Sequence, residues 1–500
     1  MASDQATEEL LKSHPGLNRL LGWCGLATLA IGYIATLLGQ IFEVKRYLFE
    51  ALGPDRLLSI HFGMAFGVAA LFIIGYLILA VWVYRRYFLQ LEQRKRRLFG
   101  GAVTVGGLLF AGCSIYAVLP PPPDVRELLD RESSLWEKEL LGLGVRGGGI
   151  RASRAEHSDE PQVWSTAQSL TGIMFNHWRP LSETDAKRIR DHLDYIDRVR
   201  IPKDEEGWGY MSDLDWGVTE IAGWVTLAYL ASTQPNLVNL VWGHDSEKAF
   251  QRLEQYLKLL QGRQLTNGAW APISQKDNLR FGRTYSTAIA VWALIEAKKH
   301  PEMGKRIGGA YDEAVEGGIR WLLARYNDQV KSWVPNPERP KQTESFPGLT
   351  AQVLYVLERA RPEFDFLLQA NSSYQRALRA YMSSIAGADV ASSLASRAAT
   401  SNDRTPDSDV YLRPSKVILE GSTFLWFPWS LALCAQLSGK AMADPNAKRA
   451  CNLLLGRIND LISFAHNDAS TYIMSESLFA IQLQVDQIIK SQVTKPVGKS

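Results

Sequence analysis

Hydrophobic residues follow different patterns in the first 120 residues and in the rest of the chain. Three runs near the start contain no charged residue: 20–42, 57–84 and 98–119. Each run is long enough to cross a bilayer core of about 30 Å as a helix, which needs about 20 apolar residues. The pattern therefore predicts three transmembrane helices. A polar tail (1–19) precedes them, and a proline-rich spacer with a linker helix (120–160) follows.

Basic residues between the runs predict the orientation of these helices. The loop after the second run is the most basic and contains Arg85, Arg86, Arg94, Lys95, Arg96 and Arg97. Cytoplasmic loops are enriched in Lys and Arg. We therefore expect a multi-pass integral membrane protein, with the lipid bilayer as a partner. Its N-terminus would be cytoplasmic and the residues after 124 extracytoplasmic.

The third run is rich in glycine, with Gly100, Gly101, Gly106, Gly107 and Gly112. Small residues let helix backbones approach closely in lipid. This helix is therefore expected to pack within the bundle or to form a homo-oligomer.

Beyond residue 124 the apolar spacing is helical. Phe250, Leu253, Leu257 and Leu260 form one face of an amphipathic helix, whereas 285–297 is apolar nearly all round. Polar-faced and fully apolar helices alternate in this way along the chain, as an outer and an inner ring of helices would require. The sequence predicts an all-α domain over residues 161–492 and a short tail at 493–500.

The apolar segments also resemble one another. Five of them begin at Val163, Val218, Thr284, Phe346 and Phe427. Threonines occupy comparable places in four segments, at Thr166, Thr219, Thr287 and Thr350. Such self-similarity is typical of a repeat architecture.

Junctions between the helices combine glycine with tryptophan. The residues expected to hold them are Gly207, Trp208, Gln264, Gly268, Trp270, Trp321 and Trp333. Glycine allows the tight turn, and the tryptophan fills the gap between neighbouring hairpins.

These junctions resemble the QW repeats of the squalene cyclase and protein prenyltransferase superfamily, and Gln264 to Trp270 is the best match. The likeness covers roughly residues 160–490. It implies an (α/α)6 toroid, in which six inner helices surround a central cavity and six outer helices surround them.

Composition and charge narrow the class of protein. The chain is 46% hydrophobic and 21% charged with a net charge of +3, which excludes a disordered chain and gives no basic footprint for nucleic acid. Cys434 and Cys451 have no histidine nearby that would complete a zinc site, so they are expected to be core residues or a disulfide. We expect neither a metal nor a cofactor.

Three acidic residues are candidate catalytic groups. Asp213 and Asp215 resemble the acidic Asp-x-Asp-Asp motif of terpene cyclases, although Trp216 occupies its fourth position. Glu220 follows in an otherwise apolar segment, where an unpaired charge is costly. Helix capping is the competing explanation for the aspartates. A glycosidase would also need carboxylates at the ends of inner helices, and further candidates are Glu344, Glu420 and Asp468.

Glu476 belongs to a second acidic motif, which begins at Asn467 and resembles the magnesium site of ionising terpene synthases. The glutamate comes one residue too late, and that motif belongs to another fold. We therefore expect no site at this motif.

Aromatic residues on or beside the inner helices are candidate ligand-binding groups: Trp164, Trp224, Tyr285, Trp292, Phe346, Phe424, Trp426, Trp429 and Tyr472. Aromatic walls bind lipid tails, sugars and apolar peptides, but aromatic side chains equally form cores. A stretch rich in Ala, Ser and Asp at 387–410 would be a lid or an insertion.

Three functions remain open. The first is a membrane-anchored toroid that binds or senses an apolar, lipid, glycan or peptide ligand and signals to the membrane bundle. The second is a diverged terpenoid cyclase acting on isoprenoid lipid, and the third is a carbohydrate-active enzyme of the cell envelope.

Overall fold

The computed structural model describes most of the chain after residue 124. The described ranges are 125–154, 160–201, 207–209, 217–273, 281–337, 345–369, 371–386, 425–437, 442–467 and 470–493. They all belong to the second of two compact units, Asp124–Ser500. The first unit, Met1–Pro123, lies outside the described residues.

The localisation expected from the sequence needs correction. In the described part of the chain, no helix combines the length and the apolar character that crossing a membrane requires. This finding contradicts the assignment as a multi-pass membrane protein with an extracytoplasmic toroid, which we withdraw. The three runs that suggested it, 20–42, 57–84 and 98–119, lie outside the described residues.

The described unit is almost entirely helical. Its helices are α5 (Val125–Gly142), α6 (Val163–Met174), α7 (Glu183–Arg198), α8 (Thr219–Ser232), α9 (Val238–Val241), η2 (Gly243–Asp245), α10 (Ser246–Gly262), α11 (Thr284–Lys299), α12 (Met303–Ile307), α13 (Asp312–Ala324), α14 (Pro347–Gln369), α15 (Ser372–Ala386), α17 (Trp426–Gln436), α19 (Pro445–Gly456), α20 (Ile458–Asn467) and α21 (Thr471–Val493). Two short strands, β1 (Ile150–Arg151) and β2 (Pro161–Gln162), pair antiparallel with Ile150 opposite Gln162.

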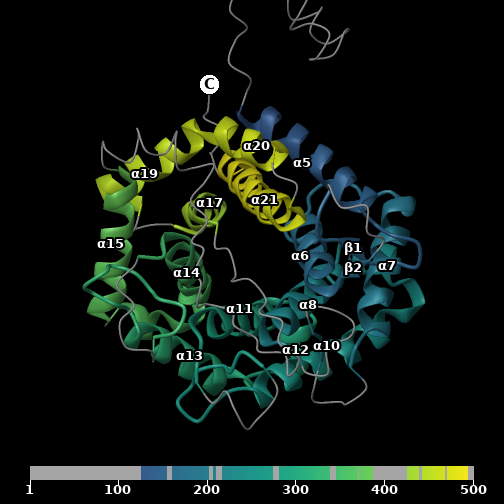
Figure 1. Cartoon of the computed structure of the whole chain (residues 1–500), viewed down its shortest axis with the longest axis horizontal. Helices are drawn as coiled ribbons and strands as arrows, with labels where there is room; N and C mark the ends of the chain where they lie inside the picture. The colour runs from purple at the N-terminus through teal and green to yellow at the C-terminus, as the bar shows by residue number, and fades with distance from the viewer. Residues whose placement is uncertain are drawn as a thin grey trace, which may run out of the picture. The chain divides into compact units, whose positions relative to one another are not determined.

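Six of the described helices form a closed inner ring. In order around the ring they are α6, α8, α11, α14, α17 and α21, and α21 packs against α6 to close it (Figure 1). These helices are buried nearly all round, and every residue of α8 is buried. The unit is therefore a helical toroid.

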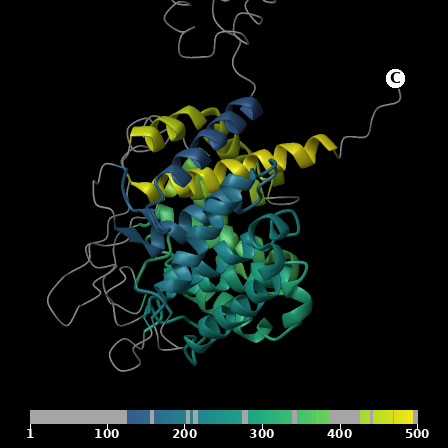
Figure 2. The ribbon, with the colours of Figure 1, turned by 90° about the vertical axis from the view of Figure 1, so that its right-hand side faces the viewer.

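The outer helices cover this ring and are amphipathic. In α10 the buried residues include Phe250, Leu253, Leu257 and Leu260, the face that the spacing predicts. The side view in Figure 2 shows α21 lengthwise, with α5 and α20 lying beside it. The helix expected in the spacer, α5, thus packs on the toroid itself.

Tryptophan fixes three of the junctions by the same hydrogen bond. The indole N–H groups of Trp208, Trp270 and Trp333 donate to backbone oxygens at the end of the preceding outer helix, with N···O distances of 2.7 Å each. All three side chains are fully buried. Trp321 instead lies within the outer helix α13.

The first junction carries no tryptophan, and the sequence pattern missed it. Val145 and Gly148 make the same backbone hydrogen bonds in this turn as Leu265 and Gly268 make in the junction between α10 and α11. Gly148 and Gly268 have φ angles of +91° and +89°, a conformation that glycine adopts without steric cost. Ile150 stands where the other turn has Trp270.

Threonines connect the junctions to the inner helices in two ways, and in the first the threonine belongs to the helix that follows the junction. The hydroxyls of Thr166, Thr287 and Thr350 accept hydrogen bonds from the backbone N–H groups of Ile150, Trp270 and Trp333, respectively. These bonds hold each turn to the helix that follows it.

Thr219 belongs to a second set, which corrects the alignment made from sequence. With Thr284 and Thr471, it opens an inner helix and bonds to the next junction around the ring. Their hydroxyls donate to the carbonyls of Ala271, Val334 and Arg151, respectively. The Thr471 bond joins the last inner helix to the first junction and so closes the ring.

A disulfide links two layers of the toroid. Cys434 on inner helix α17 is bonded to Cys451 on outer helix α19. Of the two alternatives left open by the sequence, the structure has the disulfide.

Candidate functional site

The N-terminal ends of the inner helices meet at one end of the ring. The Thr219, Thr284 and Thr471 bonds bring the start of each helix to the turn that leads into its neighbour. Helix N-termini carry a partial positive charge. This end of the toroid therefore favours negative groups.

A group of buried polar side chains lies just inside this end. We call it the polar cluster, and its members are Gln168, Glu220, Tyr285, Ser286, Gln352 and Glu476. They come from five of the six inner helices. Each member is at most 8% exposed, so the cluster concentrates polar groups where most of the toroid is apolar.

Glu476 is a carboxyl of the cluster with a perturbed pKa. Its Oε1 accepts a hydrogen bond from the Gln168 amide and its Oε2 one from the Trp429 indole, both at 2.8 Å. Burial raises the pKa of Glu476 to about 8, although these two hydrogen bonds oppose the rise. At neutral pH the side chain is therefore mostly protonated and can donate a proton.

Glu220 supplies a second carboxyl in the first turn of α8. It accepts a hydrogen bond from the Ser286 hydroxyl on the neighbouring inner helix α11.

Tyr285 connects the two carboxyls. Burial and then the charge of Glu476 raise the pKa of Tyr285 well above its ordinary value, and Glu220 contributes in the same direction. Its hydroxyl accepts a hydrogen bond from the Trp224 indole at 2.9 Å and also bonds to Gln352. Both carboxyls thus lie within electrostatic reach of one neutral phenol.

Two aromatic side chains lie one turn closer to the end of the ring. Trp164 and Tyr472 stack with ring centroids 5.5 Å apart and an interplanar angle of 22°. They precede Gln168 and Glu476 by four residues, so they share helix faces with them. Both are partly exposed.

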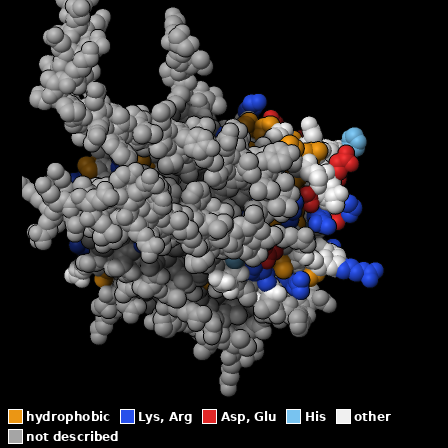
Figure 3. All heavy atoms as spheres, turned by 90° about the horizontal axis from the view of Figure 1, so that it is seen from above, with side chains coloured by type: hydrophobic (Ala, Val, Ile, Leu, Met, Phe, Trp, Pro, Cys, Tyr) orange, Lys and Arg blue, Asp and Glu red, His pale blue; other side chains and the backbone are white. Residues whose placement is uncertain are grey.

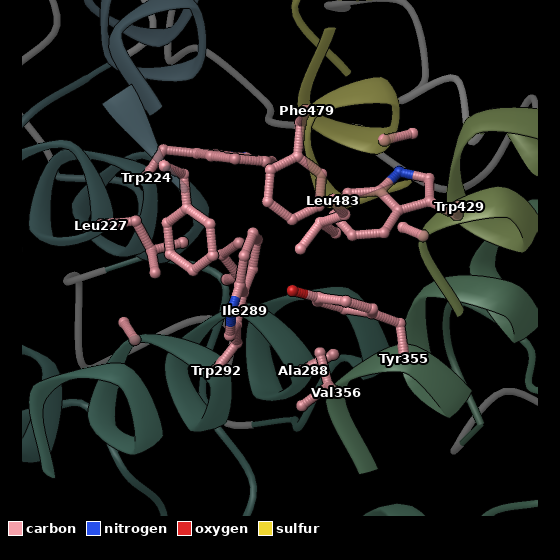
Figure 4. Packing of buried hydrophobic residues seen from close by; sticks show 14 of the residues in the cluster. Trp224, Leu227, Ala288, Ile289, Trp292, Tyr355, Val356, Trp429, Phe479 and Leu483 are labelled. Atoms are coloured by element: carbon pink, nitrogen blue, oxygen red, sulfur yellow. The ribbon is translucent and has the colours of Figure 1, made fainter. Parts of the chain in front are cut away.

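The axis of the ring is filled below the polar cluster. Trp224, Trp292, Tyr355, Trp429 and Phe479 pack against one another, one from each of five inner helices (Figure 4). We call them the aromatic plug. The centroid of Trp292 lies 5.3–5.7 Å from those of the other four. The plug contacts the polar cluster directly, because the indoles of Trp224 and Trp429 bond to Tyr285 and Glu476.

The plug reaches the opposite end of the ring through Trp292. Its indole donates to Glu296 at 3.1 Å. Arg359 holds Glu296 with two hydrogen bonds of 2.7 and 2.6 Å and also bonds to Gln436. This carboxylate is paired with a guanidinium, whereas the hydrogen bonds to Glu476 come from the neutral donors Gln168 and Trp429.

Several candidates from the sequence cannot be placed. Asp213, Asp215 and Phe424 lie outside the described residues, as do Glu344, Glu420, Asp468 and the stretch 387–410. The roles predicted for them stay predictions.

The remaining aromatic candidates divide by position. Trp224, Trp292 and Trp429 belong to the plug, Tyr285 is a member of the polar cluster, and Trp164 and Tyr472 stack one turn from it. Trp426 is buried against Phe427 at the start of α17, and Phe346 bonds through its backbone to Ser332 in a junction. The three plug tryptophans also bond to titratable side chains: Trp224 to Tyr285, Trp292 to Glu296 and Trp429 to Glu476.

Sequence reasoning discounted Glu476, and it missed Gln168 and Gln352 entirely. A usable signal existed, since all three are the sixth residue of an inner helix and are buried. A polar residue repeated at one position of a buried helix indicates a shared polar layer.

Two further observations concern the surface of the unit and its capacity to bind a metal ion. On the face shown in Figure 3, the visible described side chains mix Lys and Arg with Asp, Glu and apolar groups. Among the described residues, no three His, Cys, Asp or Glu side chains come close enough together to hold a metal ion.

Comparison with known proteins identifies no family. No family model matches the chain, and no curated protein matches it in sequence.

Solved structures share the architecture. A D-mannose isomerase aligns with 73% of this chain and 100% of its own, at a TM-score of 0.50 and 11% identity. A cellobiose 2-epimerase from Spirochaeta thermophila aligns with 74% of this chain and 100% of its own, at a TM-score of 0.48 and 12% identity. The isomerase supports the helical toroid and, at this identity, the fold alone. The resemblance to squalene cyclases is supported only as far as that fold.

Proposed function

We propose that this toroid is a carbohydrate-active enzyme that uses Glu476 and Glu220 for acid–base chemistry on a neutral sugar. The observation that carries the proposal is the buried Glu476, whose pKa burial raises to about 8, in the same cluster as a second buried carboxyl. Hydrolysis of a glycosidic bond needs such a pair, one acid and one base or nucleophile. The isomerase of similar fold acts on a sugar by its name, and we use that likeness as analogy only.

Each carboxyl has a defined role in this reaction. Glu476 gives its proton to the glycosidic oxygen as the C–O bond breaks, which leaves the sugar fragment with a hydroxyl. Glu220 takes a proton from the water that attacks the sugar carbon. The Gln168 and Trp429 hydrogen bonds stabilise the Glu476 carboxylate that results. The partly exposed Trp164 and Tyr472 supply an aromatic surface on the approach.

The test is a turnover assay on the purified full chain. A panel of neutral oligosaccharides and monosaccharides is incubated with the protein, and new reducing ends or converted sugars are detected. Glu476→Gln should reduce the rate by ~10²–10⁴-fold, the usual contribution of a positioned acid. Glu358→Gln is the matched control, because Glu358 is a buried inner-helix glutamate that pairs with Arg361 and Tyr374 outside the cluster. Turnover that survives Glu476→Gln contradicts the proposal.

A second candidate function is sugar or apolar-ligand binding without chemistry. It is favoured by the hydrogen bonds that already occupy both oxygens of Glu476. A binder would retain ligand affinity in the Glu476→Gln variant and show no turnover in the parent protein. A cyclase acting on isoprenoid lipid depends instead on Asp213 and Asp215, which lie outside the described residues.

A further inference from the structure

The two hydrogen-bond partners of Glu476 differ in whether they can also accept a hydrogen bond from it. An indole N–H only donates, whereas a glutamine amide donates through Nε2 and accepts through Oε1. Trp429 and Gln168 both donate to Glu476 as the structure stands. This arrangement suits a carboxylate, yet burial keeps the group protonated up to about pH 8.

The protonated form of Glu476 needs an acceptor, and the structure contains a suitable one. Oε1 of Gln168 is buried, and no hydrogen-bond partner reaches it among the described residues. Leaving such an acceptor unpaired is costly. The two ends of a glutamine amide have nearly the same shape, so a rotation of the amide exchanges Oε1 for Nε2. That rotation would place the unpaired oxygen where the acid proton is.

We propose that Gln168 and Trp429 are positioning residues for Glu476, and that the Gln168 amide rotates as the carboxyl gains or loses its proton. The acid form would donate to Oε1, and the carboxylate would accept from Nε2. The catalytic use of this rotation rests on the proposed function. Each state of Glu476 then has a partner in Gln168, while Trp429 favours the carboxylate alone.

Among the described residues of the polar cluster, two titratable groups accompany Glu476. Glu220 on α8 and Tyr285 on α11 belong to the same cluster, and the residues of α6 and α17 that contact it, Gln168 and Trp429, do not titrate. On α14 the nearest member of the cluster is the neutral Gln352.

Helices α5 and α20 also pack against α21, and Glu137, Glu132 and His466 on them have partners other than Glu476. Glu137 of α5 accepts from Gln482, further along α21. Glu132 of α5 lies against His466 of α20 at 3.0 Å.

The experiment titrates Glu476 directly in the full chain without substrate. Protein labelled with ¹³C-glutamate is followed by infrared difference spectroscopy, and the band of the protonated carboxyl is assigned by its loss in Glu476→Gln. Trp429→Phe should move the titration midpoint up by about one pH unit, because it removes a bond to the carboxylate only. Gln168→Met should move the midpoint less but shift the acid band, since the acid proton loses its acceptor.

Trp224→Phe is the matched control, because its indole bonds to Tyr285 and not to Glu476. It should change neither the midpoint nor the band. If Gln168→Met moves the midpoint as far as Trp429→Phe and leaves the acid band in place, Gln168 only donates and the rotation is wrong. Absence of turnover with a normal titration would contradict the proposed function alone.

Discussion

Two buried glutamates on the inner helices show how surroundings decide what one residue type does. Glu358 on α14 and Glu476 on α21 both have a pKa raised by burial. Glu358 has the guanidinium of Arg361 beside it, which opposes that rise. Glu476 has only neutral donors. The first therefore forms an ion pair with Arg361, whereas the pKa of the second stays near 8.

The raised pKa of Glu476 makes a prediction for stability. In the folded chain the group keeps its proton up to about pH 8, while the unfolded chain loses it near 4.5. The folded state therefore binds more protons between these values, and stability falls as pH rises through this window. Glu476→Gln removes the effect, so its advantage over the parent in free energy of unfolding should grow with pH. Urea unfolding across the window measures it.

A matched variant checks that prediction. Glu316 is on the outer helix α13 in an exposed pair with Arg320, so Glu316→Gln should give no comparable trend. An unchanging difference between Glu476→Gln and the parent would mean that Glu476 is ionised throughout the window.

Among the elements of the fold, the junctions carry bonds that reach from one repeat to the next. Thr284 bonds to Val334 across such a junction. Thr226, equally buried on α8, bonds only to Ala222 of its own helix. Thr284→Val should cost about 1–3 kcal/mol, because it leaves the Val334 carbonyl without a donor. Thr226→Val should cost less, and thermal unfolding of both variants compares them.

Equal losses in the two threonine variants would show that the bonds between repeats contribute nothing special. A larger loss for Thr226→Val would place the stabilisation within single helices.

The junction tryptophans give a larger expected effect. Trp270 is fully buried and its indole N–H donates to Leu260. Trp270→Ala should cost about 3–5 kcal/mol, the range for truncating a large buried aromatic. Leu240 is 48% exposed, so Leu240→Ala serves as the control. Chemical unfolding of both variants measures the difference, and similar midpoints would contradict the role given to the junction.

The helices were predictable because burial on one face or on all faces leaves a clear period in the sequence. The threonine alignment failed at one repeat because α8 has Ala222 at the position of Thr287, and Thr219 three residues earlier was matched instead. The first junction was missed because Ile150 replaces the tryptophan that identified the others.

The site was less predictable because its members come together only in the folded ring. Gln168 and Glu476 are 308 residues apart in the chain, and no local pattern connects them. In the sequence, Glu476 also follows a stretch that resembles a magnesium-binding motif, and it was discounted because it comes one residue too late for that motif. Glu220 stood out because it is alone in an apolar segment, which is a local signal.

At the level of the whole toroid, the Cys434–Cys451 disulfide ties an inner helix to an outer one across a sequence separation of 17 residues. Closing a loop of this length stabilises a fold by about 3 kcal/mol in the chain-entropy model. Replacing both cysteines by alanine should lower the free energy of unfolding by about this amount. Reductant should destabilise the parent protein and leave the double variant unchanged. Equal unfolding of the parent with and without reductant would contradict the prediction.

Closure of the ring by α21 has a consequence for synthesis of the chain. The ribosome makes the N-terminal end first, so α6 to α17 emerge while the seam between α17 and α6 still lacks its last helix. The bonds from Thr471 to Arg151 and Ala152 form only after the start of α21 has been made. Until then, apolar side chains that later face α21 stay exposed to the cell. A nascent chain of this kind would depend on chaperones until the last helix emerges, and premature stop codons within α21 would yield aggregating products.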